Sequence, residues 1–166
     1  EGIKDLQIND LYIQNAEKVW YATNNGNIGY IENNQVRDYY QILDKNVVIS
    51  SLIIKDQHLF LGTMGDGIWI ANLNNPREIK PLSGIKKLNS KNIYQLIFDT
   101  DGNLWAGTEK GVNKIIIDAN TSMLDVFYFG RNDGFLGIET IKNAISKDVD
   151  GNLWFGTMNG LTKYIP

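Results

Sequence analysis

A short motif recurs four times along this chain of 166 residues. Each copy is a largely apolar run of six residues that has an aromatic residue at its third position, ends in Thr and is followed by Gly within three residues. The aromatic residues are Trp20, Phe60, Trp105 and Trp154, spaced 40, 45 and 49 residues apart. Periods of roughly 40 to 50 residues are typical of propeller blades or of helical arrays. We therefore expect an array of similar units.

The pattern within each copy favours strands over helices. In residues 104–108 the side chains fall into two alternating sets, with Trp105 and Gly107 in one of them, which is the two-residue period of a strand. Pairs such as Asp101-Gly102 and Asn159-Gly160 flank the copies. These pairs favour tight hairpin turns because their residues tolerate positive φ. The sequence predicts an all-β protein.

Four strands can be placed in each complete unit. In the third unit they are expected at 93–99, 104–108, 112–117 and 124–129. A four-stranded antiparallel meander repeated about an axis is a propeller blade. The prediction is a single β-propeller fragment over residues 1–166, with about four blades at approximately 8–42, 47–81, 92–130 and 140–166, the last lacking its fourth strand.

The repeated aromatic and Gly residues have a physical role in such an array. Trp105 and its equivalents each bury roughly 150–250 Å² and are expected to fill the wedge between neighbouring blades. Gly107 leaves room for a neighbouring residue to approach closely. We expect the four blades to be part of a larger ring, for instance of seven blades, whose uncovered terminal blades self-associate. The alternative is a closed ring of four blades, completed by residues 3–6.

Composition excludes several functional classes. Lys and Arg total 16 against 19 Asp and Glu, a net charge of −3, whereas a nucleic-acid surface needs a dense basic patch. The chain has no Cys and one His, so disulfides, thiol nucleophiles and His-rich metal sites are not expected. No apolar run approaches the about 18 residues of a membrane helix. No cofactor is predicted.

Two acidic turns, 99–103 and 148–152, resemble the start of a calcium-binding loop. A helix–loop–helix calcium site also needs a bidentate Glu at the twelfth loop position. Lys110 and Asn159 occupy those positions, so hairpin turns are favoured. The Gly-rich segment 62–67 lacks the helix and Lys of a phosphate-binding loop and is also interpreted as a turn.

Other residues have a catalytic and a structural interpretation. His58 is expected to be a solvated turn residue, since no triad pattern accompanies it. Asp133 and Glu139 could form a glycosidase pair, although acidic residues on loops are usually just solvated. The aromatic runs 39–40 and 127–129 are expected to pack between blades, with sugar stacking as the alternative.

Residues 101–108 with Gly111, and 150–157 with Gly160, resemble the two-component regulator propeller repeats. These repeats occur in the extracytoplasmic sensor region of bacterial hybrid histidine kinases. The segment 133–136 resembles the family's link between blades, and the chain from 137 onward resembles the last blade before a small β-sandwich domain.

The resemblance implies a non-catalytic, periplasmic, ligand-sensing segment of a two-component sensor histidine kinase. Relatives often detect oligosaccharides, so an oligosaccharide is the implied ligand, and membrane attachment would come only through downstream segments. Related propellers also precede diguanylate cyclase modules, which leaves the output domain open. The alternatives are a scaffold for protein partners and a carbohydrate-active propeller enzyme.

By analogy with other propellers, the ligand is expected on the face built by the inter-blade loops and by the turns between second and third strands. No catalytic residue or metal ligand is predicted. The predicted ligand-binding residues are Asn24, Asn25, Asp66, Glu109, Lys110 and Asn159 in the turns, and Lys91, Asn92, Arg131, Asp133 and Glu139 in the loops.

Overall fold

A computed structural model describes residues 7–41, 47–83, 87–135 and 137–166. These residues form four antiparallel sheets and one short 3-10 helix, η2 (Arg131–Asp133). The first sheet contains β1 (Ile8–Asn15), β2 (Lys18–Thr23), β3 (Asn27–Glu32) and β4 (Gln35–Gln41). The second contains β5 (Ile49–Lys55), β6 (His58–Thr63), β7 (Ile68–Asn72) and β8 (Asn75–Pro81). The third contains β9 (Gln95–Phe98), β10 (Leu104–Thr108), β11 (Gly111–Ile117) and β12 (Met123–Phe129), and the fourth β13 (Thr140–Lys147), β14 (Leu153–Thr157) and β15 (Gly160–Tyr164).

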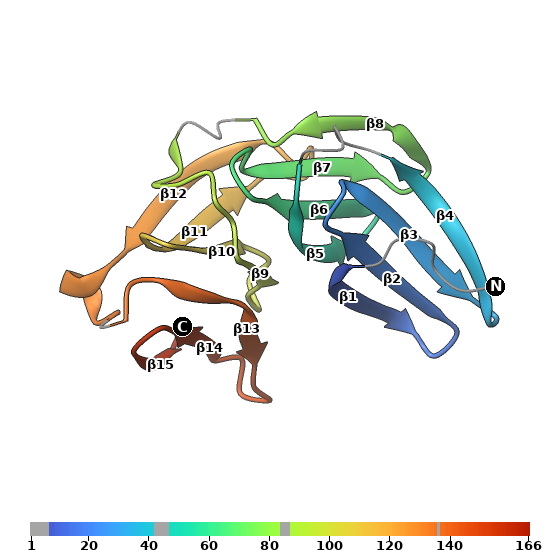
Figure 1. Ribbon diagram of the computed structural model, residues 1–166. Helices are drawn as coiled ribbons and strands as arrows, with labels where there is room; N and C mark the ends of the chain where they lie inside the picture. Colours follow the sequence, from blue (N-terminus) through green and yellow to red (C-terminus); the bar gives the residue numbers. More distant parts are fainter. Residues whose placement is uncertain (1–6, 42–46, 84–86, 136) are drawn as a thin grey trace.

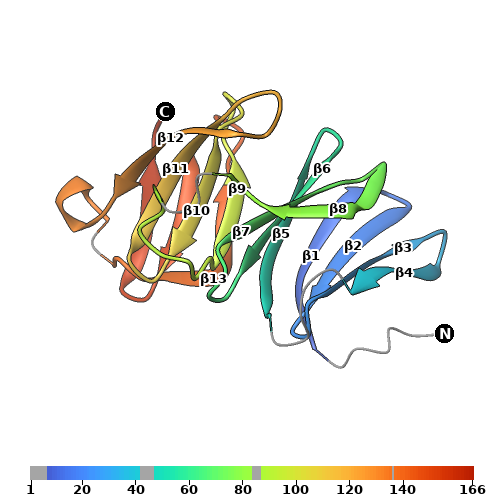
Figure 2. The same cartoon turned by 90° about the horizontal axis from the view of Figure 1, so that it is seen from above.

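Each sheet is a meander in which strands that follow one another in the sequence are paired. The sheets fan out as the blades of a propeller, with β1, β5, β9 and β13 innermost (Figures 1 and 2). The predicted all-β, four-bladed propeller fold is confirmed. The described part of the fourth blade has three strands. The alternative in which residues 3–6 complete that sheet lies outside the described residues.

The aromatic residue of each second strand, which we call its anchor, faces the following blade. Trp20 packs with Leu59 and Leu61 of the second blade. Phe60 packs in the same way against the third blade, and Trp105 against the fourth. The residues on either side of each anchor pack against the preceding blade, because successive side chains of a strand point to opposite faces. Each of these three wedges is therefore filled from both sides.

The Gly that follows Phe60, Trp105 and Trp154 by two positions allows close packing, as predicted, whereas the first blade has Ala22 at this position. A Cβ on Gly62 would lie 2.7 Å from Cγ2 of Ile93. A Cβ on Gly107 would lie 2.7 Å from Oε1 of Gln95 and 2.8 Å from Oγ1 of Thr140. Ile93 and Thr140 belong to the next segment along the ring, whereas Gln95 lies on β9 of the same blade as Gly107. A larger residue at either Gly would therefore push against the adjacent blade.

Polar side chains join the innermost strands to one another. In each case a side chain of one blade bonds to the backbone of the next, which satisfies polar groups near the axis. Between the first and second blades, Oδ2 of Asp10 accepts a hydrogen bond from the Leu52 N–H at 2.7 Å. The others are Ser50 Oγ to Ile93 O, Gln95 Nε2 to Ile141 O at 2.6 Å, and Asn143 Nδ2 to Asn9 O at 2.7 Å.

The aromatic residues 127–129 pack less uniformly than predicted. Phe129 stacks on Trp105 of its own blade with ring centroids 5.3 Å apart, and its ring lies 5.9 Å from that of Tyr164 in the fourth blade, as expected for packing between blades. Phe127 and Tyr128 are each 50% exposed, so that expectation is wrong for them. They lie on β12, the outermost strand of its blade, where only one neighbouring strand covers the chain. The side chains of residues 39–40 lie outside the described residues.

Replacement of different anchors by Ala should lower the free energy of unfolding by different amounts. Trp105 is fully buried, and we expect Trp105→Ala to lower the free energy of unfolding by about 3–5 kcal/mol. Trp154 is half-buried, so Trp154→Ala should lower the free energy of unfolding by less than half of that amount. Urea unfolding followed by circular dichroism measures both values. Equal losses would contradict the wedge-filling role of Trp105.

Candidate functional site

The predicted ligand-binding residues lie at one end of the propeller, where the turns after the second strands meet the inter-blade loops. The best-ordered group among them surrounds Glu109, in the turn after β10. Ser90 Oγ donates hydrogen bonds to Oε1 and Oε2 of Glu109 at 2.7 and 2.9 Å. Asn92 Nδ2 also donates to Oε1 at 3.3 Å. The loop before β9 thus holds this carboxylate in one orientation.

Tyr94 connects this group to the fourth blade. It immediately precedes β9, and Asn143 of β13 donates its backbone N–H to the Tyr94 carbonyl at 3.1 Å. Partial burial, followed by the nearby carboxylates of Glu109 and Glu139, raises the pKa of the Tyr94 phenol above its ordinary value of 10.0. The phenol therefore stays protonated at neutral pH. The carboxylates of Glu109 and Glu139 thus lie near enough to the Tyr94 phenol to disfavour its ionised form.

Other predicted residues support loops or lie apart from this cluster. The Lys91 carbonyl accepts the N–H groups of Gly65 and Gly67 at 3.2 and 2.8 Å, which ties the exposed Asp66 turn to the third blade. The Lys110 carbonyl accepts the Tyr128 hydroxyl at 2.6 Å. In the first blade, Asn24 Oδ1 accepts from Asn9 Nδ2 at 3.5 Å. Asn25 lies in the same exposed turn.

Of the predicted residues around the last inter-blade loop, only Glu139 lies near the Tyr94 phenol. Asp133 Oδ2 accepts the Gly130 N–H at 2.9 Å and so caps η2, in which exposed Arg131 also lies. Glu139 accepts the Met158 N–H through its backbone carbonyl at 2.9 Å. Asn159 lines a hollow of about 270 Å³ together with Gly134, Gly137 and the start of β15. The hydrogen bond that caps η2 explains the position of Asp133 without any role in glycoside hydrolysis.

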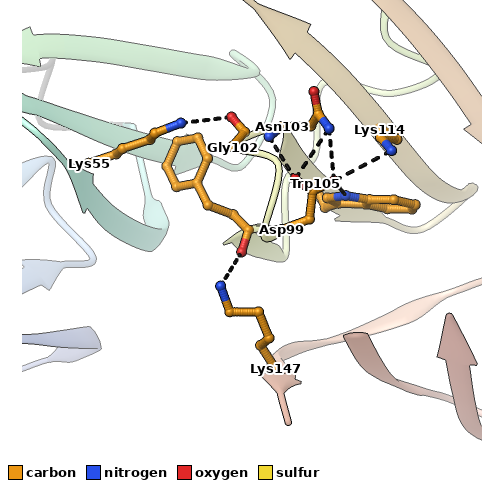
Figure 3. Close-up of polar contacts among 8 residues, drawn as sticks. Lys55, Asp99, Gly102, Asn103, Trp105, Lys114 and Lys147 are labelled. Carbon is orange, nitrogen blue, oxygen red and sulfur yellow. Dashed lines mark hydrogen bonds and ion pairs between the residues drawn. The ribbon is translucent and has the colours of Figure 1, made fainter. Parts of the chain in front are cut away.

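The opposite end of the propeller carries a network centred on Asp99 (Figure 3). Its Oδ2 accepts the indole N–H of Trp105 at 2.9 Å, and Asn103 donates to both carboxylate oxygens. Lys114 Nζ lies 3.5 Å from Oδ2. Burial alone would raise the pKa of Asp99, but the hydrogen bonds from Trp105 and Asn103 and the charge of Lys114 lower it below 3.8. Donors from the protein itself thus occupy the carboxylate that resembled a calcium ligand.

The same network recurs wherever the anchor is Trp. Asp148 accepts the indole N–H of Trp154 at 2.8 Å, and Gln14 accepts that of Trp20 at 2.7 Å. In the second blade the anchor is Phe60, which has no N–H, and Ile54 occupies the position of the acceptor. The acidic residues were predicted only as parts of hairpin turns. Their spacing of six residues before Trp was the signal for this additional role.

Two Lys residues from flanking blades hold the same hairpin of the third blade (Figure 3). Lys55 Nζ of the second blade donates to the Gly102 carbonyl at 2.9 Å. Lys147 Nζ of the fourth blade donates to the Phe98 carbonyl at 3.2 Å. These charge-assisted bonds connect three consecutive blades. At this end of the propeller, Lys side chains thus link each blade to the next.

A groove of about 410 Å³ lies at this end, between the second and third blades. It is lined by His58 of β6, by Asn72, Glu78 and Lys80, and by Asn120. His58 is half-buried and begins a strand, so the expectation of a solvated turn residue is wrong. The groove is larger than the hollow beside Asn159, and no sequence motif predicts it.

The described residues contain neither a cluster of metal ligands nor a membrane-spanning helix. In them, no three His, Asp or Glu side chains gather closely enough to hold a metal ion. Nor does any helix among them have the length and apolarity to cross a membrane.

Comparison with known proteins supports the fold and the repeat. The family model for the two component regulator propeller matches residues 87–110 and 136–159, which confirms the resemblance for those segments. Each match runs from an inter-blade loop to the turn after a second strand, and together they contain Glu109, Tyr94 and Glu139. No curated protein matches the sequence.

Several solved structures are similar. The extracellular domain of a hybrid two component system from B. thetaiotaomicron has a TM-score of 0.72 at 21% identity over 96% of this chain, and another such domain from the same organism has 0.62 at 15% over 99%. A virginiamycin B lyase from Staphylococcus aureus has 0.69 at 14% over 98%. This chain spans 23%, 27% and 57% of those chains, respectively. At these identities the likeness establishes the fold.

The Asp99 network predicts a pH-dependent stability. We expect Asp99→Asn to lower the free energy of unfolding near pH 7 by about 1–3 kcal/mol, the usual worth of hydrogen bonds to a buried charged group. Below pH 3.8 the unfolded state binds a proton at residue 99 that the folded state does not yet bind. The advantage of the unmodified protein should therefore shrink as the pH falls below 3.8.

Urea unfolding of both proteins over this pH range measures the difference in free energy. The two proteins are compared because burial raises the pKa of Asp10, so Asp10 makes total stability change with pH in the direction opposite to Asp99. This contribution is the same in both proteins and cancels in the difference. Asp101→Asn, at an exposed position of the same turn, is the matched control and should leave stability nearly unchanged. A difference that does not vary with pH would show that Asp99 is not held as a charged acceptor.

Proposed function

We propose that this chain is a non-catalytic, ligand-sensing propeller segment of a two-component sensor whose full-length form is a histidine kinase. The observation that carries the proposal is the tandem match to the two component regulator propeller model, on consecutive blades of a propeller. The extracellular domains of hybrid two component systems with the same fold support an extracytoplasmic, periplasmic location.

The proposed binding site is the cluster of Tyr94, Glu109 and Glu139. Its two carboxylates accept hydrogen bonds and its protonated phenol donates one. Ser90 and Asn92 already hold the Glu109 carboxylate, so little conformational freedom is lost when a ligand binds. Such a site suits a ligand rich in hydroxyl groups, and we propose an oligosaccharide.

The position of the cluster also suggests how binding is transmitted. The loop before β9 and the start of β13 belong to the third and fourth blades, and they meet at Tyr94. A ligand held by both blades stabilises one relative orientation of the two. Rigid-body movement of packed units is a common way for a binding event to reach a following domain.

Titration calorimetry with a panel of neutral and acidic oligosaccharides tests the proposal. We expect saturable binding that Tyr94→Ala weakens about tenfold or more, because one hydrogen bond to the ligand and one aromatic face are removed. The matched control is Asn120→Ala in the groove at the opposite end, which should bind as the unmodified protein does.

Other outcomes would contradict separate parts of the proposal. Loss of binding in Asn120→Ala alone would place the site in the groove beside His58. Chemical turnover of an oligosaccharide would show a propeller enzyme. Binding of protein partners with no response to any saccharide would favour a scaffold.

A further inference from the structure

Tyr128 presents an aromatic ring at the same end of the propeller as the cluster of Tyr94, Glu109 and Glu139. It lies near the end of β12, the outermost strand of the third blade. Its hydroxyl donates to the Lys110 carbonyl, in the turn after β10, at 2.6 Å. The third blade lies between the second and the fourth (Figure 1), and yet the side chain is 50% exposed. Packing between blades therefore does not explain its position.

The strand register places the Tyr128 side chain toward the second blade. Tyr128 is opposite Asn113, and Asn113 is opposite Ala106. Directly opposed residues share one face of a sheet, and Ala106 packs in the core between the second and third blades. The preceding residue, Phe127, therefore lies on the other face of the blade. Because Phe127 is also 50% exposed, the two rings form a matched pair.

Two Gly residues leave the space that the Tyr128 ring occupies. A Cβ on Gly111 would lie 2.9 Å from Cε2 of Tyr128, and a Cβ on Gly130 would lie 2.7 Å from its Cζ. The hydroxyl end of the ring thus packs against backbone at both positions, while the hydrogen bond to Lys110 fixes its direction. A ring that is already held in place loses little conformational freedom when a ligand packs on it.

The loop before β9 connects this ring to the Glu109 carboxylate. Asn89 Nδ2 donates to the same Lys110 carbonyl as the Tyr128 hydroxyl, at 3.2 Å. The next residue, Ser90, donates to both carboxylate oxygens of Glu109. Tyr128 and Glu109 are therefore supported by one loop and belong to one continuous polar surface.

The width of the blade separates Tyr128 from Tyr94. Tyr94 precedes β9, and Tyr128 lies on β12, three strands away in the same sheet. Three spacings of about 4.7–4.9 Å between neighbouring strands give about 14 Å. A sugar ring with its immediate neighbour is shorter than this distance. A saccharide that contacts both Tyr residues therefore needs at least three rings.

We propose that Tyr128 is a second sugar-binding position, on which an outer ring of an oligosaccharide stacks while another ring binds at the Tyr94 cluster. This position presupposes the function proposed above and adds a minimum length to its ligand. The C–H groups of a sugar form an apolar face that packs on an aromatic ring, and polar groups around the ring bind its hydroxyls. Exposed Lys110 and Arg131, which adjoin Gly111 and Gly130 in the sequence, carry such donors.

Titration calorimetry with cello-, malto-, chito- and galacturono-oligosaccharides of two to six rings tests the proposal. We expect Tyr128→Ala to weaken binding of the longest saccharide about tenfold, because the stacking surface is lost, and to leave the affinity for the matching disaccharide unchanged. Tyr94→Ala should weaken both. Phe127→Ala is the matched control, since it removes an equally exposed ring from the other face and should bind every length as the unmodified protein does.

Two further variants separate the ring from its support. Tyr128→Phe keeps the ring and loses one hydrogen bond, so its affinity should stay within about fivefold of that of the unmodified protein. Gly130→Ala keeps Tyr128 but displaces its ring, because the φ of −130° at Gly130 is open to Ala and the added Cβ meets the ring. It should weaken binding of the longer saccharides as Tyr128→Ala does.

The outcomes distinguish this position from the function itself. Unchanged binding by Tyr128→Ala at every length, or an equal loss in Phe127→Ala, would overturn the second position and leave the proposed function standing. Equal weakening of the disaccharide would place Tyr128 in the first position and overturn the minimum length. If the unmodified protein binds no saccharide of any length, the proposed function fails, and the second position fails with it.

Discussion

The second strands of the second and third blades are buried on both of their faces, and the architecture depends on this double burial. In β10, Trp105 packs toward the fourth blade, while Leu104 and Ala106 pack toward Phe60 of the second. A blade is a single sheet and has no core of its own, so its stability comes from the two wedges that it shares with its neighbours. The same dependence explains why the outward faces of the first and fourth blades remain apolar and exposed.

The polar groups are divided between the two ends of the propeller. At one end, a buried indole N–H needs an acceptor, and the chain supplies Gln14, Asp99 or Asp148 only where the anchor is Trp. Leaving such a group unpaired costs about 1–3 kcal/mol, so anchor and acceptor change together. Structural support of this kind at one end leaves the loops at the other end, around Tyr94, available for a ligand.

Much of the fold could be predicted from the sequence, because strand period and turn residues are local signals. The anchors, the Gly after them and the four-bladed arrangement are examples. The role of Asp99 could not be predicted in full, since its contact with Trp105 depends on hairpin register. Tyr94 was assigned to a strand predicted at 93–99, whereas β9 begins at Gln95. Loop residues of different blades approach one another only through blade packing, so residue type alone did not separate Glu109 from Arg131.

Nuclear Overhauser contacts between side chains test the central arrangement most directly. The propeller arrangement requires contacts from the Trp105 indole to the rings of Tyr164 and Phe155, whose centroids lie 4.4 and 5.8 Å away, and from Leu104 to the Phe60 ring. It also predicts no contacts among Trp20, Trp105 and Trp154, which belong to different wedges. Mutual contacts among these three indoles would place them in one shared core and contradict the propeller.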